Sequence, residues 1–453
     1  MNQPAPASKL AITSWALFDW AGQPFFVLIT AFVFAPYFAS ALADTPAEGQ
    51  TLWGYATAAS GLAIALLAPI LGAIADATGH RKPWIFAFSI PFVIACCMLW
   101  YTSPENPSSI AIAVVSFAVA TLAIEFATIF NNSMMPDLVA PNKVGRLSGA
   151  GWAAGYVGGL ISLVIVLGFF TAKPETGLTL LGIDPWFGLD AATREGDRAT
   201  GPFSALWYLI FVLPLFLFTP DAPKKSALGL AIKTGPSNLL KSLRNARKRK
   251  PMFVFLLANM IYKDGFVALA AFAGIYAAGQ LGWSSIQIGS FGILVTITGI
   301  FGAIIGGSLD DRFGPKAVVF GALLILIVSC LGIISIDRTT IFFFIETTPA
   351  PAGSAPFSSL PEQMFLALGG LIGAAAGPMQ ASSRSLLIYL APKKQISEFF
   401  GLLALSGKVT SFLAPLLVSL VTLASGSQSA GMSIILLFFI LGAFLLTRID
   451  NKS

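Results

Sequence analysis

The sequence predicts an all-α membrane protein with twelve transmembrane helices, arranged as two similar six-helix bundles. Three observations predict this fold class. Charged residues form 11% of the 453-residue chain and apolar residues 56%, whereas a soluble domain usually contains about 25% charged residues. Apolar stretches long enough to cross a bilayer recur along the chain. One short loop pattern also occurs twice, 235 residues apart, which indicates an internal duplication.

The apolar spans are expected to be helices, because backbone groups surrounded by lipid must be paired within the chain. The first six lie near residues 13–40, 51–75, 83–101, 109–132, 146–170 and 203–219. The second six lie near residues 252–278, 286–309, 316–336, 363–388, 398–424 and 429–447. We therefore expect an N-terminal bundle over 1–219, a cytoplasmic basic linker over 220–250 and a C-terminal bundle over 251–453.

Lysine and arginine predict the orientation of the chain. Of the 27 basic residues, 20 lie in one alternating set of loops and termini and four in the other. Because such residues accumulate on the cytoplasmic side, we expect both termini in the cytoplasm. The run Arg244–Lys250 is interpreted as a contact with anionic lipid headgroups rather than with nucleic acid. The long loops 171–202 and 337–362 are then outside, the first as a lid or a connector.

The repeated loop has the spacing G-x3-D-x2-G followed by basic residues. The copies carry Gly72, Asp76, Gly79 and Arg81 in the first half and Gly307, Asp311 and Gly314 in the second. The glycines permit a sharp turn between two closely spaced helices, and the aspartates can accept hydrogen bonds from helix N-termini. We interpret the copies as gating loops that dock against a neighbouring helix in one conformation and release it in another. The alternative is a tight turn with a basic anchor.

Six charged residues fall within the predicted spans, where each costs about 2.5–3.5 kcal/mol on a lenient insertion scale. They are Asp19, Glu125, Lys263, Asp264, Arg384 and Lys408. Asp19 is interpreted as a gating or coupling residue, with a carboxylate bonded to nearby hydroxyls and indoles as the alternative. Glu125 lies in an otherwise apolar run, where burial favours a protonation switch. A structural ion pair is the alternative for Glu125.

Lys263 and Asp264 are adjacent, so they point about 100° apart around their helix. We assign Lys263 a substrate-facing role and Asp264 a structural or gating role, because Asp19 occupies the place that matches Asp264 in the first half. Lys408 needs a partner such as Asp264 or Glu125 and is interpreted as half of a static pair.

Arg384 lies nearer the cytoplasmic end of its span, where snorkelling to the membrane interface is an alternative to a role in the cavity. Three polar side chains complete the set of candidates for substrate binding or coupling: Asn131, Tyr156 and Gln380. Amides and hydroxyls in a helix bundle either bond across helices or orient a solute.

Missing residue types exclude several classes of function. The three cysteines, Cys96, Cys97 and Cys330, lie inside apolar spans, and the adjacent pair points in different directions. Neither a disulfide nor a metal site is therefore expected, and His80 is the single histidine. The sequence contains no Walker loop, nucleophile elbow or dinucleotide fingerprint. We expect no cofactor, no metal, no enzymatic activity and no ATP-driven pump.

Several further stretches complete the pattern set by the paired loops. They are Trp15–Ala21, Phe130–Asn132, Met135–Pro136, Gly145–Tyr156, Tyr262–Gly265, Gln380–Ser385 and Glu398–Lys408. The loops resemble the signature loop of the major facilitator superfamily, the twelve-helix secondary transporters. The other stretches resemble its vacuole-effluxer branch, bacterial relatives of the fungal vacuolar amino-acid exporter. Gly22, Gln23, His80 and Pro315 depart from the family pattern. The resemblance implies the major facilitator fold, with helices one, four, seven and ten lining a central cavity.

A secondary transporter that works by alternating access is the leading interpretation. Separated acids and bases suit a zwitterion such as an amino acid, which the resemblance also implies, and a buried carboxylate could couple transport to protons or sodium. The alternatives are an exporter of hydrophobic or cationic compounds, favoured by 38 phenylalanines, and a non-transporting membrane scaffold. Expected partners are a small-molecule substrate, a coupling ion and membrane lipids, but no nucleic acid, and the chain is expected to be a monomer.

Overall fold

The computed structural model describes residues 7–44, 46–172, 176–227, 229, 232, 250–283, 285–348 and 356–449. Most of the predicted linker, including the run Arg244–Lys250 apart from Lys250 itself, lies outside the described residues.

The chain divides into two compact units, which are described separately. Unit 1 comprises Met1–Ala140, Ala154–Ser237 and Lys394–Gly401, and unit 2 comprises Pro141–Ala153, Asn238–Lys393 and Leu402–Ser453. Each unit therefore contains one short stretch from the other half of the sequence. The division into bundles over 1–219 and 251–453 stays a prediction.

The first half of the chain contains nine α-helices in the described residues. They are α1 (Lys9–Pro24), α2 (Phe34–Tyr37), α3 (Pro46–Thr78), α4 (Lys82–Met98), α5 (Ser109–Ser133), α6 (Met135–Leu138), α7 (Val144–Phe169), α8 (Glu195–Arg198) and α9 (Thr200–Phe218). The first predicted span is not one regular helix, because α1 ends at Pro24 and wide π-helical turns follow over Phe25–Phe32. Proline lacks the backbone N–H of a regular turn, and its ring disturbs the preceding turn.

The second half contains seven α-helices in the described residues and a small hairpin. The helices are α11 (Lys250–Leu281), α12 (Ser285–Phe313), α13 (Pro315–Ile334), α14 (Leu360–Leu390), α15 (Ile396–Ser406), α16 (Leu413–Ser425) and α17 (Gln428–Thr447). Strands β1 (Thr340–Ile341) and β2 (Ile345–Glu346) pair antiparallel within the predicted outside loop 337–362.

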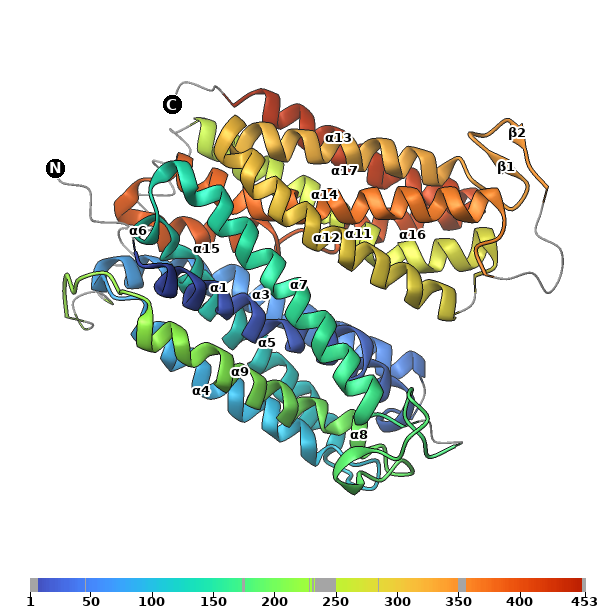
Figure 1. The fold of residues 1–453 in the computed structure, drawn as a ribbon, viewed down its shortest axis with the longest axis horizontal. Coiled ribbons are helices and arrows are strands. Elements are labelled where there is room, and N and C mark those ends of the chain that lie inside the picture. The colour runs from blue at the N-terminus through green and yellow to red at the C-terminus, as the bar shows by residue number, and fades with distance from the viewer. Residues whose placement is uncertain are drawn as a thin grey trace. The chain divides into compact units, whose positions relative to one another are not determined.

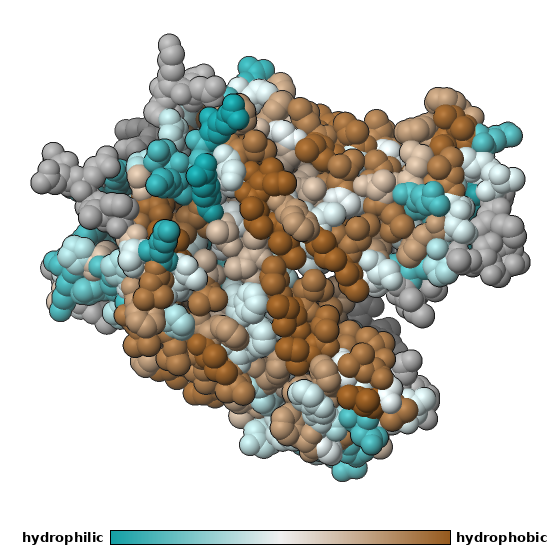
Figure 2. All heavy atoms as spheres, in the orientation of Figure 1, coloured by the Kyte–Doolittle hydropathy of each residue, from teal (hydrophilic) through white to brown (hydrophobic). Residues whose placement is uncertain are grey.

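Helices dominate the fold. In the described part of the chain, eleven helical segments are long and apolar enough to cross a membrane, and α16 is a shorter apolar helix of 13 residues. Large apolar side chains are exposed along these helices (Figure 2), for example Leu66 on α3, Ile94 on α4 and Val328 on α13. Exposed apolar faces of this length suit lipid rather than water. The predicted all-α membrane fold is confirmed.

The predicted eleventh span is where the structure departs from one continuous helix. α15 ends at Ser406, and α16 begins at Leu413 after a non-helical stretch. Glycine, threonine and serine in this stretch have lower helix propensity than leucine or alanine. Tight turns pair part of its backbone, since Ser411 N–H donates to the Lys408 carbonyl at 3.4 Å and Leu413 N–H to the Thr410 carbonyl at 2.7 Å. Expecting an uninterrupted helix over 398–424 was therefore wrong.

Small residues bring helices of unit 2 into close contact. α12, α13 and α14 lie side by side in Figure 1, and α14 contacts both of the others. A Cβ on Gly302 of α12 would lie 2.1 Å from the Ala374 carbonyl oxygen, and one on Gly373 of α14 would lie 2.2 Å from the Val295 carbonyl oxygen. Only glycine allows this backbone approach, as in other small-residue helix contacts in membranes.

Candidate functional site

The first repeated loop joins α3 to α4 and holds a buried ion pair. Gly79 has φ +91°, a left-handed value that reverses the chain between the helices. Arg81 donates to the Asp76 carboxylate at 2.7 Å, and their side chains are only 5% and 6% exposed. Arg81 also donates to Ser133 Oγ at 3.0 Å. The basic residue therefore fixes the aspartate and the end of α5 together.

Asp76 also contacts the first turn of α15. Its carboxylate accepts from the backbone N–H of Ser397 at 3.2 Å and of Glu398 at 2.8 Å. These two groups have no partner within a helix at its N-terminus, where a negative charge is also favoured by the helix dipole. A Cβ on Gly72 would lie 2.4 Å from the Ser397 carbonyl oxygen. The prediction that this aspartate accepts from a helix N-terminus is confirmed, and Gly72 is required for the close approach.

The second loop makes the same contact with the first turn of α7. Asp311 accepts from the backbone N–H of Arg146 at 3.3 Å and pairs with the Arg146 guanidinium at 3.1 Å. A Cβ on Gly307 would lie 2.7 Å from the Gly145 carbonyl oxygen, and Gly314 has φ +85° just before α13. Both copies of the loop therefore present an aspartate to the N-terminus of a helix that is distant in sequence.

The two loops differ in where their cation comes from. Arg81 follows Asp76 by five positions, and the residue five positions after Asp311 is Lys316. Lys316 does not reproduce the pair, because its Nζ donates to the Ile449 carbonyl at 2.5 Å. Arg146 of α7 supplies the positive charge instead. The repeated spacing therefore conserves the aspartate and the glycines, but not the origin of the basic group.

Arg384 is buried against the first turns of α7. Its Nε donates to Ser148 Oγ at 2.9 Å and its terminal nitrogen to the Ser148 carbonyl at 2.7 Å. The guanidinium carbon also lies 5.4 Å from the centre of the Trp152 ring, a distance typical of a cation–π contact. With Arg384 only 6% exposed, the snorkelling alternative is wrong. Arg384 joins α14 to α7.

The broken helix lies against the charged pair of α11. A Cβ on Gly407 would lie 2.9 Å from Lys263 Nζ, so this side chain extends directly over the end of α15. Asp264 is 1% exposed and faces Thr410 of the non-helical stretch. Asn259, one turn earlier on α11, donates to Ser406 Oγ at 2.9 Å. Lys263 and Asp264 thus meet the point where the backbone leaves the helix, and Lys408 belongs to the same stretch.

Four candidates lie in unit 1, on three helices. Asp19 on α1 is half-buried, and a Cβ on Gly155 of α7 would lie 3.5 Å from its Cβ. Asn131 on α5 is fully buried; its carbonyl accepts from Trp15 Nε1 at 2.8 Å. Its amide atoms have no hydrogen-bond partner within the described residues. Glu125 on α5 and Tyr156 on α7 are both half-buried.

The other five candidates lie in unit 2: Lys263, Asp264, Gln380, Arg384 and Lys408. The structure brings Lys263, Asp264 and Lys408 to one region around the helix break and places Arg384 on a different contact. Gln380 is half-buried on α14.

Sequence reasoning missed several residues that support these sites. Asp221 accepts from the backbone N–H of Arg81 at 2.8 Å and of Lys82 at 3.1 Å, so it caps α4. A lone acid directly after the last span of the first half was the available signal. Ser148 and Thr410 gave no such signal, because a hydroxyl inside an apolar span usually bonds to its own helix.

Comparison with solved structures identifies the fold. A crystal structure of the major facilitator superfamily transporter FucP in the outward conformation aligns with a TM-score of 0.71 at 15% identity, covering 98% of this chain and 99% of that one. The human organic anion transporter MFSD10 aligns with a TM-score of 0.67 at 18% identity over 97% and 99%. The chain has the fold of the major facilitator superfamily of secondary transporters.

The family follows from the sequence comparison. The family described as "Vacuole effluxer Atg22 like" matches residues 50–453, and the chain belongs to it. An uncharacterized MFS-type transporter, YxiO of Bacillus subtilis, is 24% identical over 449 residues, 97% of this chain and 95% of its own. Autophagy-related protein 22 of Yarrowia lipolytica is 27% identical over 315 residues, 62% of this chain and 46% of its own. The chain is therefore a secondary transporter and not an enzyme.

Proposed function

We propose that this transporter moves a small zwitterion of the amino-acid class across the bacterial inner membrane by alternating access. The observation that carries the proposal is the break between α15 and α16, packed against Lys263 and Asp264. Discontinuous helices in transporters expose backbone groups at the depth where solutes bind. A lysine and a carboxylate beside such a break offer one group for each charge of a zwitterion. Both chain termini are proposed to be cytoplasmic, and the working unit a monomer.

Each charge of the substrate has a proposed contact. The carboxylate of the solute would bind Lys263, whose ammonium lies over Gly407, and the second cation of this region, Lys408, would add to the positive field. The ammonium of the solute would bind Asp264. A neutral sugar would form no ion pair with Lys263 or Asp264, so these charges favour a zwitterion as the solute.

The repeated loops are proposed to act as latches during transport. In the present conformation Asp76 and Asp311 accept from the first turns of α15 and α7. Three hydrogen bonds of this kind are not needed to hold tight turns, which the glycines already form. Releasing them would free α15, the helix that ends at the proposed substrate site. Release of the loops would thereby allow α15 to move at the proposed substrate site.

The first test is thermal stabilisation of the purified protein by a panel of amino acids, peptides, sugars and bulky organic cations. A ligand of the native state raises apparent stability by mass action, about 2.7 kcal/mol at a hundred times its dissociation constant. We expect a shift with one amino-acid class that Lys263→Ala removes. Lys224→Ala is the matched control, since Lys224 is exposed in unit 1, and should keep the shift.

Two outcomes would contradict the zwitterion proposal. Shifts only with bulky cations would identify an exporter of cationic compounds and make the carboxylates Asp19 and Glu125 the next residues to neutralise. An amino-acid shift of equal size in Lys263→Ala and in the unmutated protein would keep the substrate class but remove Lys263 from the site.

A further inference from the structure

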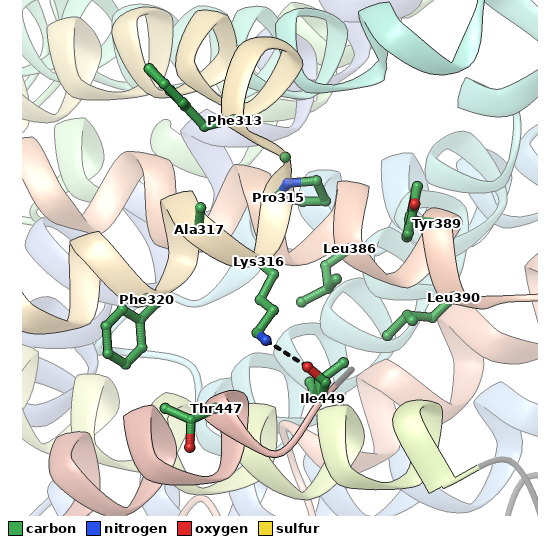
Figure 3. Close-up of a pocket in the computed structure, with 11 residues that line it drawn as sticks. Phe313, Pro315, Lys316, Ala317, Phe320, Leu386, Tyr389, Leu390, Thr447 and Ile449 are labelled. Carbon is green, nitrogen blue, oxygen red and sulfur yellow. Dashed lines mark hydrogen bonds between the residues drawn. The ribbon is translucent and has the colours of Figure 1, made fainter. Parts of the chain in front are cut away.

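A cavity at one end of unit 2 lies outside the proposed substrate site. It has a volume of about 520 Å³ and is lined by Phe313, Gly314, Pro315, Lys316, Ala317, Phe320, Leu386, Tyr389, Leu390, Thr447 and Ile449. This volume is within the range of roughly 300–1,000 Å³ that ligand pockets occupy. Figure 3 shows Lys316 reaching from α13 toward the end of α17, with Leu386 and Leu390 of α14 beside it.

The lining residues all come from helix ends. α12 ends at Phe313, α13 begins at Pro315, α14 ends at Leu390 and α17 ends at Thr447. These ends carry basic residues and belong to the side proposed to be cytoplasmic. Phe313 and Tyr389 are 60% and 62% exposed, and aromatic side chains of this kind gather where acyl chains meet headgroups. In the proposed orientation, the cavity would lie at the cytoplasmic membrane interface.

The charge around the cavity is positive. Among the described residues, Lys316 lines the cavity and two exposed arginines adjoin lining residues in the sequence. Arg312 stacks on the ring of Phe313, which lines the cavity, and Arg448, between Thr447 and Ile449, stacks on the ring of Phe444, which does not. Asp310 and Asp311 do not offset these charges at the cavity, because both carboxylates are buried toward the first turn of α7. The first turn of α13, which has no side-chain cap, adds the partial positive charge of a helix N-terminus.

Lys316 is available because the second repeated loop differs from the first. In the first loop the equivalent residue, Arg81, is folded onto Asp76. In the second, Arg146 satisfies Asp311, and the Lys316 ammonium lies at the cavity with one hydrogen bond to the Ile449 carbonyl. An ammonium group has three donors. Two of its three N–H groups can therefore reach a bound anion while the bond to α17 stays in place.

We propose that this cavity binds an anionic phospholipid of the cytoplasmic leaflet. The phosphate would contact Lys316 with the two arginines nearby, and an acyl chain would lie on Leu386, Leu390 and Phe320. A soluble anion would use the charges but not the apolar lining, and a zwitterionic lipid would leave the positive rim without compensation. Occupancy would brace the second repeated loop against α17, so lipid composition would act on one of the two latches. The proposal does not depend on the transported substrate.

The test uses delipidated full-length protein in detergent and native mass spectrometry. Dioctanoyl phosphatidylglycerol, dioctanoyl phosphatidylcholine and inorganic phosphate are the probes. We expect phosphatidylglycerol to bind preferentially, and Lys316→Gln and Arg448→Gln each to weaken it about fivefold, the factor for one surface charge near an anionic lipid. Leu390→Trp, which fills the cavity and keeps every charge, should abolish the preference. Lys224→Gln is the control and should bind as the unmutated protein does.

Four results would overturn the lipid site. Equal binding of the two lipids would contradict the role of the positive charges, and equally strong binding of inorganic phosphate would contradict the role of the acyl chain. A Leu390→Trp variant that keeps the full preference would move the binding elsewhere. If a chain ending at Ile449 binds phosphatidylglycerol and the full chain does not, residues 450–453 are the occupant instead. Because each variant is compared with and without lipid, a loss of basal stability in Lys316→Gln does not affect the result.

Discussion

At the scale of single residues, the two loops show how one spacing can be satisfied by different chemistry. Asp76 takes its cation from within its own loop, through Arg81, and Asp311 takes it from Arg146 on the helix it caps. Gly401 and Gly407 lie 252 residues after Gly149 and Gly155, and at the same offset the residue that matches Arg146 is Glu398. This position of α15 therefore offers no positive side chain to Asp76, and Arg81 within the loop supplies the positive charge.

The buried pair in the first loop leads to a prediction about stability. Removing one partner of a buried ion pair costs about 3–5 kcal/mol, because the other charge stays buried without compensation. Asp76→Asn and Arg81→Gln should each cause a loss of this size, measured as resistance to thermal unfolding in detergent. The double variant should lose less than the sum of the two. A strictly additive double variant would show that the residues act separately.

At the scale of elements, the division of the predicted eleventh helix is the feature that creates the proposed site. α15 is packed on α3 through Gly401, where a Cβ would lie 2.4 Å from the Ala68 carbonyl oxygen. For Gly407, six residues later, the three atoms nearest to an added Cβ all belong to the flexible end of Lys263. An added side chain at position 401 would therefore collide with rigid backbone, whereas one at position 407 would meet a mobile side chain.

This difference predicts opposite results for two alanine substitutions. Gly401→Ala forces two backbones apart and should lower stability by about 1–3 kcal/mol, the range for overpacking. Gly407→Ala displaces the Lys263 ammonium, so stability should change little while stabilisation by the zwitterion is lost. Thermal unfolding with and without ligand measures both. Ligand stabilisation that survives Gly407→Ala would show that the position of Lys263 is unimportant for binding.

Hydropathy and the repeated pattern predicted the ends of most helices to within a few residues. This is possible because a helix that crosses the bilayer needs an unbroken stretch of mostly apolar residues. The break at Gly407 was not predicted, although the stretch contains glycine, lysine, threonine and serine. Each of these residues is tolerated in a membrane helix whose neighbours satisfy its freed groups. Whether the helix continues or breaks depends on what packs against it, and here this is the charged pair of α11.

At the scale of the whole molecule, the duplication distributes the ionisable candidates over both units. Glu125 lies in unit 1, and Lys263 and Asp264 lie in unit 2. A transporter that couples an ion to a solute requires the occupancy of one site to change the affinity of another, and this coupling is reciprocal. We propose Glu125 as the group that takes up the coupling proton.

If Glu125 takes up the coupling proton, transport should no longer depend on the proton gradient when its carboxyl group is replaced by one that cannot titrate. In proteoliposomes, Glu125→Gln should transport at the same rate with and without an imposed proton gradient, while the unmutated protein should be accelerated by it. Exchange of the solute without a gradient is the control for folding. Gradient dependence that is unchanged in Glu125→Gln would remove this residue from the coupling scheme, and dependence on sodium alone would exclude the proton.

The sequence by itself determined the class of fold, the approximate helices, the repeated loops and the list of charged residues within spans. These are properties of short stretches, because lipid imposes the same requirement on each span separately. Only the tertiary structure decided which distant residues meet: Asp76 with Ser397 and Glu398, and Arg384 with Ser148. It also decided that Lys316 reaches a cavity while Arg81 is held in a pair. These contacts depend on how helices pack, and local composition does not encode the partner of a side chain.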